Sequence, residues 1–193
     1  MNITRNALAM AGVCAVVGLG ITTRAQQPPP PAPKPAPASD AAPAGGTVAV
    51  AKLSPTTGST VRGEVTFTQT EKGVQVVGSL TGMHMGEHGF HIHEKGDCSA
   101  PDGASAGGHF NPTTQPHAAR DAAARHVGDL GNLKADPYGM ARANFVDEKI
   151  SLTGPNSIIG RAVIVHEKAD DYTTQPTGNA GGRQACGVIE AKK

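Results

Sequence analysis

From residue 47 onward, the chain is a succession of short runs in which apolar and polar side chains alternate, separated by turn residues. TVAVAKL (47–53) and VRGEVTFTQT (61–70) alternate in this way, and a Glu-Lys-Gly turn leads into VQVVGSLTG (74–82). Two such runs joined by a short glycine-containing turn predict a β-hairpin. Further runs cover residues 89–94, 140–148, 158–167 and 185–191. The pattern predicts an all-β domain, an antiparallel sandwich or barrel of about eight strands.

Two segments between these runs are too long to be ordinary turns. Residues 94–130 are rich in Gly, Pro, Asp and His, and residues 168–183 have the same character. Within the first, only residues 118–126 (AARDAAARH) have a spacing that suits a helix. Loops of this length in a compact domain are functional or disordered. The histidines of the first loop favour order, so we expect two long functional loops.

The chain begins with a segment that predicts export. Residues 1–25 combine a positively charged start, an apolar run of about sixteen residues, and small residues at Thr23 and Ala25. This is the layout of a secretory signal peptide that is cleaved after Ala25. An acylated Cys14 is not expected, because AGVC lacks the large apolar residue that precedes a lipoprotein cysteine. We therefore expect an exported protein without a lipid anchor and without stable membrane insertion after cleavage.

A linker separates this segment from the predicted domain. Residues 26–46 are rich in Pro and Ala, which predicts an extended chain that serves as a spacer or as a tether to the envelope. Residues 47–193 then form a single domain. The whole chain has 17 basic and 16 acidic residues and no basic stripe, which argues against a nucleic-acid partner.

Export also bears on the cysteines. Removal of the signal peptide leaves Cys98 and Cys186. In an oxidising compartment two cysteines most simply form one disulfide, and the alternative is a pair of unpaired buried thiols.

Three histidines occupy strand positions that a metal ion would explain. His91 and His93 are two residues apart in one strand, so both side chains point to the same face. His166 lies among valines in another strand, where an unpaired polar group would be costly. This set supplies only nitrogen, and imidazoles with an open position suit Cu(II), although zinc is not excluded.

The first long loop contains a second set of metal-ligand residues. His109, His117 and His126 follow one another at intervals of eight and nine residues, and Asp129 comes three residues later. Three imidazoles and one carboxylate make a closed tetrahedral set for Zn²⁺. Ligation would also give a fixed shape to a loop that contains few apolar residues.

Five motifs together resemble, in order and spacing, the signatures of the copper/zinc superoxide dismutases: HGFHIHEKGD, GGHFNP, HVGDLGN, VIVHEKADD and GNAGGRQACGVI. The resemblance covers about residues 47–190. Export, and a cysteine directly after the H-x-H strand in GDC, resemble the bacterial periplasmic branch. The resemblance implies a Greek-key β-sandwich or barrel, one copper and one zinc per subunit, and superoxide as the substrate. A homodimer is compatible with the family but is not fixed by these motifs.

The resemblance also implies a role for each site residue. The implied copper ligands are His91, His93, His109 and His166, and the implied zinc ligands are His109, His117, His126 and Asp129. His109 would bridge the two ions as an imidazolate. Asp170 would bond to the ligands His91 and His117 from outside, and the disulfide between Cys98 and Cys186 would pin the loop that carries Arg183.

Four residues near these motifs complete the prediction. Arg183 matches the arginine that attracts and positions superoxide, and Thr177 would line the same channel. His88 matches a structural position that bonds to the backbone. His84 has no implied role, so we expect a surface residue, with an accessory copper site formed with the flanking methionines Met83 and Met85 as the alternative.

The implied activity is dismutation of superoxide to oxygen and hydrogen peroxide by a redox-cycling copper that is bridged to a structural zinc. It would serve antioxidant defence in the periplasm. Two other functions agree less well with the sequence. A metal carrier would have no need of an anion-guiding arginine such as Arg183. A zinc hydrolase is disfavoured because Glu87, Glu94 and Glu167 do not occur in an H-E-x-x-H spacing.

Overall fold

The computed structural model describes residues 46–193. The expectations for the signal peptide, for Cys14 and for nearly all of the linker therefore lie outside the described residues. Within residues 46–193, no helix is long and apolar enough to cross a membrane.

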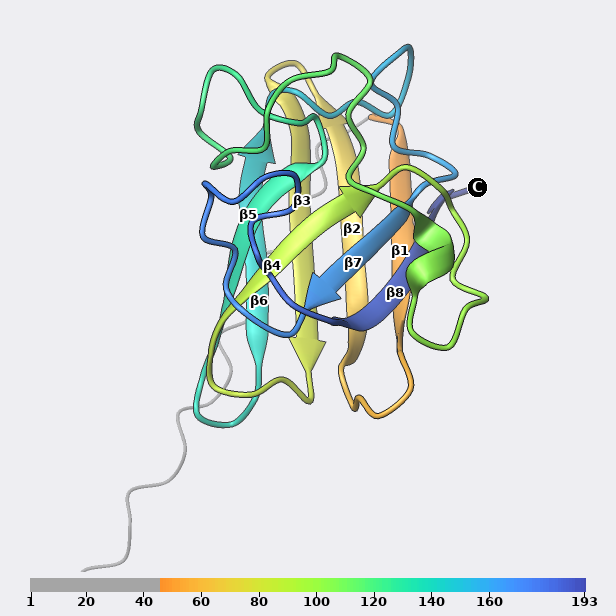
Figure 1. Cartoon of the computed structure of the whole chain (residues 1–193). Helices are drawn as coiled ribbons and strands as arrows, with labels where there is room; N and C mark the ends of the chain where they lie inside the picture. Colours follow the sequence, from red (N-terminus) through yellow and green to blue (C-terminus); the bar gives the residue numbers. More distant parts are fainter. Residues whose placement is uncertain (1–45) are drawn as a thin grey trace, which may run out of the picture. The chain divides into compact units, whose positions relative to one another are not determined.

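Eight antiparallel strands close into a barrel (Figure 1), which confirms the predicted all-β class. Along the chain they are β1 (Val48–Pro55), β2 (Arg62–Thr70), β3 (Gly73–Thr81), β4 (Gly86–His93), β5 (Asp129–Ala135), β6 (Ala141–Asp147), β7 (Ala162–His166) and β8 (Arg183–Ala191). Around the barrel the order is β1-β2-β3-β6-β5-β4-β7-β8. The successive strands β4, β5 and β6 are neighbours, and β3, which precedes them in the chain, lies beside β6. This is a Greek-key arrangement.

The alternation seen in the sequence places the core. In β2 and β3, Val65, Phe67 and Val76 are fully buried inside the barrel, while their chain neighbours are more exposed. The β2–β3 hairpin pairs Thr70 with Gly73 at its tight end. Period-two patterning therefore specified which side chains face inward.

β5 was not among the predicted strands. Its sequence, DLGNLKA, has Gly131 and Asn132 in the middle, and both residue types favour turns. The strand nevertheless pairs with β4, with an irregular register between Gly89 and His91. Gly131 lies at this irregularity with a φ of 83°, a left-handed backbone conformation that suits glycine. A β-bulge thus explains why a strand has the local sequence of a turn.

The helical pattern at residues 118–126 was misleading, because the segment forms turns and bends. The amide of Ala122 donates to the carbonyl of Ala119 in a single turn, and two other amides bond to a side chain instead of continuing a helix. The amides of Ala118 and His126 both donate to Oδ2 of Asp129, at 3.2 and 3.0 Å. The one helical element among the described residues is a short 3₁₀ turn, Ala104–Ala106.

β4 and β7 differ from the other strands because they are buried on both faces. Phe90 and Ile92 of β4 point into the barrel core, whereas His91 and His93 point outward yet are at most 1 % exposed. The outer face is covered by the loop of residues 94–128 and by the loop of residues 167–182 (Figure 1). A small second cluster, in which Ile164 and Cys186 pack with Ala106, lies under the first loop. The site is built between the barrel and these loops.

Candidate metal centre

The first cluster consists of the histidines that the strands present on their outer face. β4 carries His91 and His93, and the adjacent β7 carries His166. The loop brings in His109, which forms an isolated antiparallel bridge with His93. One ligand atom from each of these four residues lies within 4.8 Å of the others, and all four are buried. The structure thus assembles the predicted copper set.

The second cluster combines His109, His117, His126 and Asp129, again buried and with ligand atoms within 4.8 Å of one another. Oδ1 of Asp129 lies 2.9 Å from Nδ1 of His109, 3.0 Å from Nδ1 of His117 and 3.2 Å from Nδ1 of His126. One carboxylate oxygen therefore faces three imidazole nitrogens. This is the predicted zinc set.

In the first cluster, the protein holds one nitrogen of each strand imidazole and leaves the other facing the cluster. Nε2 of His91 bonds to Asp170, Nδ1 of His93 donates to the carbonyl of Gly107, and Nδ1 of His166 lies 3.3 Å from the carbonyl of Gly181. Among the described residues, the inward nitrogens of two of these rings have only each other as hydrogen-bond partners: Nε2 of His93 lies 3.4 Å from Nε2 of His166. Nδ1 of His91 is buried and makes no hydrogen bond. Buried polar atoms are normally satisfied, so these nitrogens fit a metal ion.

His109 belongs to both clusters. Its Nδ1 atom faces Asp129 at 2.9 Å, and its Nε2 atom, on the side of the first cluster, is buried without a hydrogen-bond partner. Its ring centroid lies 4.1 Å from that of His91 and 5.5 Å from that of His126. One imidazole can therefore present a nitrogen to each of two ions.

Asp170 links the two clusters from outside. Its Oδ2 atom lies 2.8 Å from Nε2 of His91, and its Oδ1 atom lies 2.9 Å from Nε2 of His117. The carboxylate needs the space left by Gly178, whose φ of 68° is left-handed. A Cβ atom at Gly178 would collide with Oδ1 of Asp170 and would lie 2.6 Å from Nε2 of His117. The geometry agrees with the predicted position of Asp170, because outer partners of this kind fix the orientation of ligand imidazoles.

The electrostatics favour neutral imidazoles in the first cluster. Burial lowers the pKa of His109 to about 4 and that of His166 to about 3, since a charged ring would lose its hydration. Burial also lowers the pKa of His91 and of His93. Neutral rings have a free lone pair at pH 7, which is the form that binds a metal ion.

The second cluster favours a cation. Burial alone would raise the pKa of Asp129 and Asp170, but hydrogen bonds from the histidines outweigh it and hold both pKa values well below the usual range. Burial likewise lowers the pKa of His117, but its two carboxylate partners outweigh this and raise the pKa to about 9. The ionised carboxylates thus stabilise positive charge here, whether a proton or a metal ion supplies it.

Arg183 begins β8 and pairs across the sheet with His166. Its Nη1 and Nη2 atoms donate to the carbonyls of Gly103 and Gly107, both at 2.5 Å. A guanidinium carries five N–H donors, so three remain. Burial lowers the pKa of this half-buried arginine, which stays charged at pH 7. Thr177, the other predicted channel residue, lies half-buried in the second loop.

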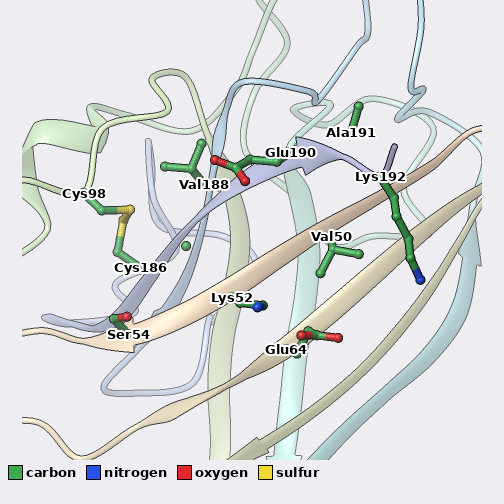
Figure 2. Close-up of a pocket in the computed structure, with 11 residues that line it drawn as sticks. Val50, Lys52, Ser54, Glu64, Cys98, Cys186, Val188, Glu190, Ala191 and Lys192 are labelled. Atoms are coloured by element: carbon green, nitrogen blue, oxygen red, sulfur yellow. A yellow bond between two sulfur atoms is a disulfide. The ribbon is translucent and has the colours of Figure 1, made fainter.

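The predicted disulfide is present. Cys98 in the first loop and Cys186 in β8 are joined by a disulfide that spans 88 residues. It lines one end of a pocket of about 740 Å³ on the β1–β8 side of the barrel (Figure 2). Lys52, Glu64 and Glu190 also line this pocket, but none of the clustered histidines does. The disulfide therefore ties the first loop to β8 outside the metal clusters.

The histidines outside the clusters also have defined places. His88 is buried, with Nδ1 2.9 Å from the carbonyl of His166 and Nε2 2.9 Å from that of His84, which confirms its backbone-bonding role. His84 is exposed, as expected. Met83 is 6 % exposed and packs in the core, whereas Met85 is 71 % exposed. The burial of Met83 in the core does not support the alternative of an accessory copper site that His84 forms with both methionines.

The supporting roles of three residues around the two clusters were not predicted from the sequence. Arg125 is buried beside Asp147 and bonds to backbone carbonyls around the second cluster. Asn132 pairs with both backbone polar groups of Asp170, and Gln175 pairs with those of His117. The only local signal was Arg125, a charged residue in an Ala-rich run directly before a ligand histidine.

The comparison with known proteins decides the family. A sequence model of copper/zinc superoxide dismutase matches residues 61–189, which include all residues of both clusters. This chain belongs to the copper/zinc superoxide dismutase family. It is 50 % identical over 141 residues to the extracellular superoxide dismutase [Cu-Zn] of Drosophila melanogaster, covering 68 % of this chain and 77 % of that protein.

A solved structure agrees. The crystal structure of the clock protein EA4 superimposes with a TM-score of 0.70 and 50 % sequence identity, over 76 % of this chain and 96 % of that one. The copper/zinc superoxide dismutases are oxidoreductases that bind copper and zinc, and the two clusters fit metal sites of this kind.

Proposed function

We propose that the chain dismutes superoxide with copper held by the first cluster and zinc held by the second. The copper ligands are His91, His93, His109 and His166, and the zinc ligands are His109, His117, His126 and Asp129. The observation that carries the proposal is His109, whose two ring nitrogens face opposite clusters. Four inward imidazoles suit copper, and three imidazoles with one carboxylate suit zinc.

The chain's own groups bring superoxide to the site and supply a proton. Copper, when bound, supplies a one-electron redox couple. Arg183 attracts the anion by its permanent charge and orients it with the N–H groups that Gly103 and Gly107 leave free. Thr177 lines the approach. Nε2 of His109 takes up a proton and donates it as the peroxide product forms, while a second proton comes from water.

We also propose that the enzyme is exported and protects the cell envelope against superoxide. The support is the signal-peptide layout of residues 1–25, with residues 26–46 as a linker and residues 47–193 as the enzyme domain. A disulfide between Cys98 and Cys186 agrees with an oxidising compartment, and the Drosophila relative is named extracellular. Location in a bacterial periplasm, without a lipid anchor, is the specific form of this proposal. Fractionation of a bacterium that expresses the full chain, with sequencing of the mature N-terminus, tests it.

The activity is tested by counting metals in the purified protein and measuring superoxide consumption at several salt concentrations. We expect one copper and one zinc per chain and a rate that falls as salt increases, because salt screens the guanidinium. Arg183→Ala should lower the rate and weaken its salt dependence with metal content unchanged. A protein that holds both metals but does not consume superoxide would instead be a metal carrier.

The zinc assignment has its own test. Asp129→Ala removes the one carboxylate that faces three imidazoles, so zinc occupancy and thermal stability should both fall. Unchanged zinc content in this variant would show that zinc binds elsewhere.

A further inference from the structure

Gln175 makes a two-point contact with the backbone of a proposed zinc ligand. Its Oε1 atom accepts a hydrogen bond from the amide of His117, and its Nε2 atom donates to the carbonyl of the same residue, both at 2.8 Å. The side-chain amide therefore pairs with a main chain 58 residues away as a neighbouring strand would. The match of donor to acceptor at both ends sets the orientation of the amide group.

His117 needs such a partner because its surroundings offer no regular secondary structure. The residue is 2 % exposed and lies in an irregular stretch of the first loop. Buried backbone amides and carbonyls are nearly always hydrogen-bonded. Among the described residues, Gln175 is the one side chain of loop 167–182 that bonds to the backbone of loop 94–128.

The same loop also holds the ring of His117. Nε2 of the imidazole bonds to Asp170 at 2.9 Å, so that Nδ1 is turned toward Asp129. Gln175 fixes the backbone to which the ring is attached, and Asp170 fixes the far edge of the ring. Loop 167–182 thus holds His117 at both ends of the residue.

We propose that Gln175 is a positioning residue for the zinc site, which it orders by holding the main chain of His117 in the ligating position. The proposal rests on the proposed zinc role of the second cluster. Partners outside the ligand shell commonly change metal affinity by about 10–100-fold when they are removed. We expect the lower end, about tenfold, because Gln175 acts through the backbone and is itself exposed.

The test compares Gln175→Met, which keeps the side-chain length but removes the amide, with Gln175→Ala. Gln115→Met is the matched control, because Gln115 lies in the loop that carries His117, is exposed and donates its side-chain amide to the carbonyl of Thr113. Zinc affinity is measured by competition with a chromophoric chelator, and Co²⁺ bound in place of zinc reports ligand geometry by its visible absorption. Hydrogen exchange at the His117 amide reports the contact directly.

Both Gln175 variants should bind zinc about tenfold more weakly, show altered Co²⁺ bands and exchange the His117 amide at least about tenfold faster, whereas Gln115→Met should match the parent. Zinc affinity within twofold of the parent in either folded variant, with the Co²⁺ bands unchanged, would overturn the proposal. If the parent itself took up no zinc, the zinc assignment would be wrong. The exchange rate would then still decide whether Gln175 holds His117.

Discussion

The buried pair of Arg125 and Asp147 should contribute strongly to the stability of the metal-free enzyme. Nη2 of Arg125 lies 2.7 Å from Oδ2 of Asp147, and both side chains are at most 2 % exposed. Nη1 donates to the carbonyls of His126, Val127 and Asp129, at 2.9, 3.2 and 3.1 Å. The pair therefore fastens the end of the first loop to the end of β6.

Asp147→Asn isolates the charge of this pair. The substitution keeps the side-chain volume and the Oδ1 atom, which accepts hydrogen bonds from the backbone amides of Lys149 and Ile150 at 2.9 and 3.1 Å. It leaves the Arg125 guanidinium buried without a counter-charge. Breaking a buried pair in this way costs about 3–5 kcal/mol. We expect about 3 kcal/mol, because three carbonyls still accept hydrogen bonds from Arg125, and a Tm about 6–12 °C lower.

The measurement is urea and thermal unfolding of the chelator-treated protein with its disulfide intact, because bound metals would add to the stability of the native state. Asp121→Asn is the control, because Asp121 is an exposed acid in the loop that carries Arg125. This substitution should change the free energy of unfolding by less than about 0.5 kcal/mol. A loss below about 1 kcal/mol in Asp147→Asn would refute the reasoning, since the buried charge would then be solvated in some other way.

Two further results are expected for the metal-free protein. Replacing Cys98 and Cys186 by Ser should lower the free energy of unfolding by about 4–5 kcal/mol, because the bond closes a loop of 88 residues in the unfolded chain; equal urea midpoints for the two proteins would contradict this. Lowering the pH from 7 to 5 should lower the urea midpoint, because the pKa values of His109 and His166, about 4 and about 3 in the folded protein, lie below the unfolded value of about 6.5, so the unfolded chain binds more protons. His117, with a pKa of about 9 in the folded protein, contributes a little more stability as the pH falls over the same window, but this offsets only a small part of the loss from His109 and His166. A urea midpoint that does not change over this window would refute the prediction.

The elements that the sequence predicted correctly are those whose signal is local. Alternation along β2 and β3 identifies inward residues without knowledge of the partner strand. His91 and His93 share a face because of strand geometry alone. β5 escaped prediction because Gly131 serves a bulge, which exists only when β4 is paired beside it. The ligand residues were predictable for another reason, since few residue types bind copper or zinc and their motifs match a known family.

The supporting contacts could not be predicted, because their partners are distant in sequence and chemically ordinary. Gln175 and His117 are 58 residues apart, and Arg125 and Asp147 are 22 apart. Nothing in a loop glutamine or in an aspartate at the end of a strand distinguishes a solvated side chain from one that holds a backbone segment. Only the folded arrangement of the loops and β6 makes that distinction.

The contacts around Gly107 explain how a loop can hold the proposed anion-binding residue Arg183 close to the proposed copper ligand His93. The carbonyl of Gly107 accepts hydrogen bonds from Nη2 of Arg183 and from Nδ1 of His93. The guanidinium of Arg183 and the imidazole of His93 therefore bond to the same carbonyl group, and a small shift of the loop displaces the hydrogen-bond acceptor of both side chains together. The disulfide acts on the same unit, because Cys186 lies three residues after Arg183 and is bonded to Cys98 in the loop that carries Gly107. The spacing between Arg183 and the first cluster thus depends on covalent and hydrogen bonds within one unit, which allows a loop with few apolar side chains to fix the proposed substrate-binding group relative to the proposed metal-binding groups.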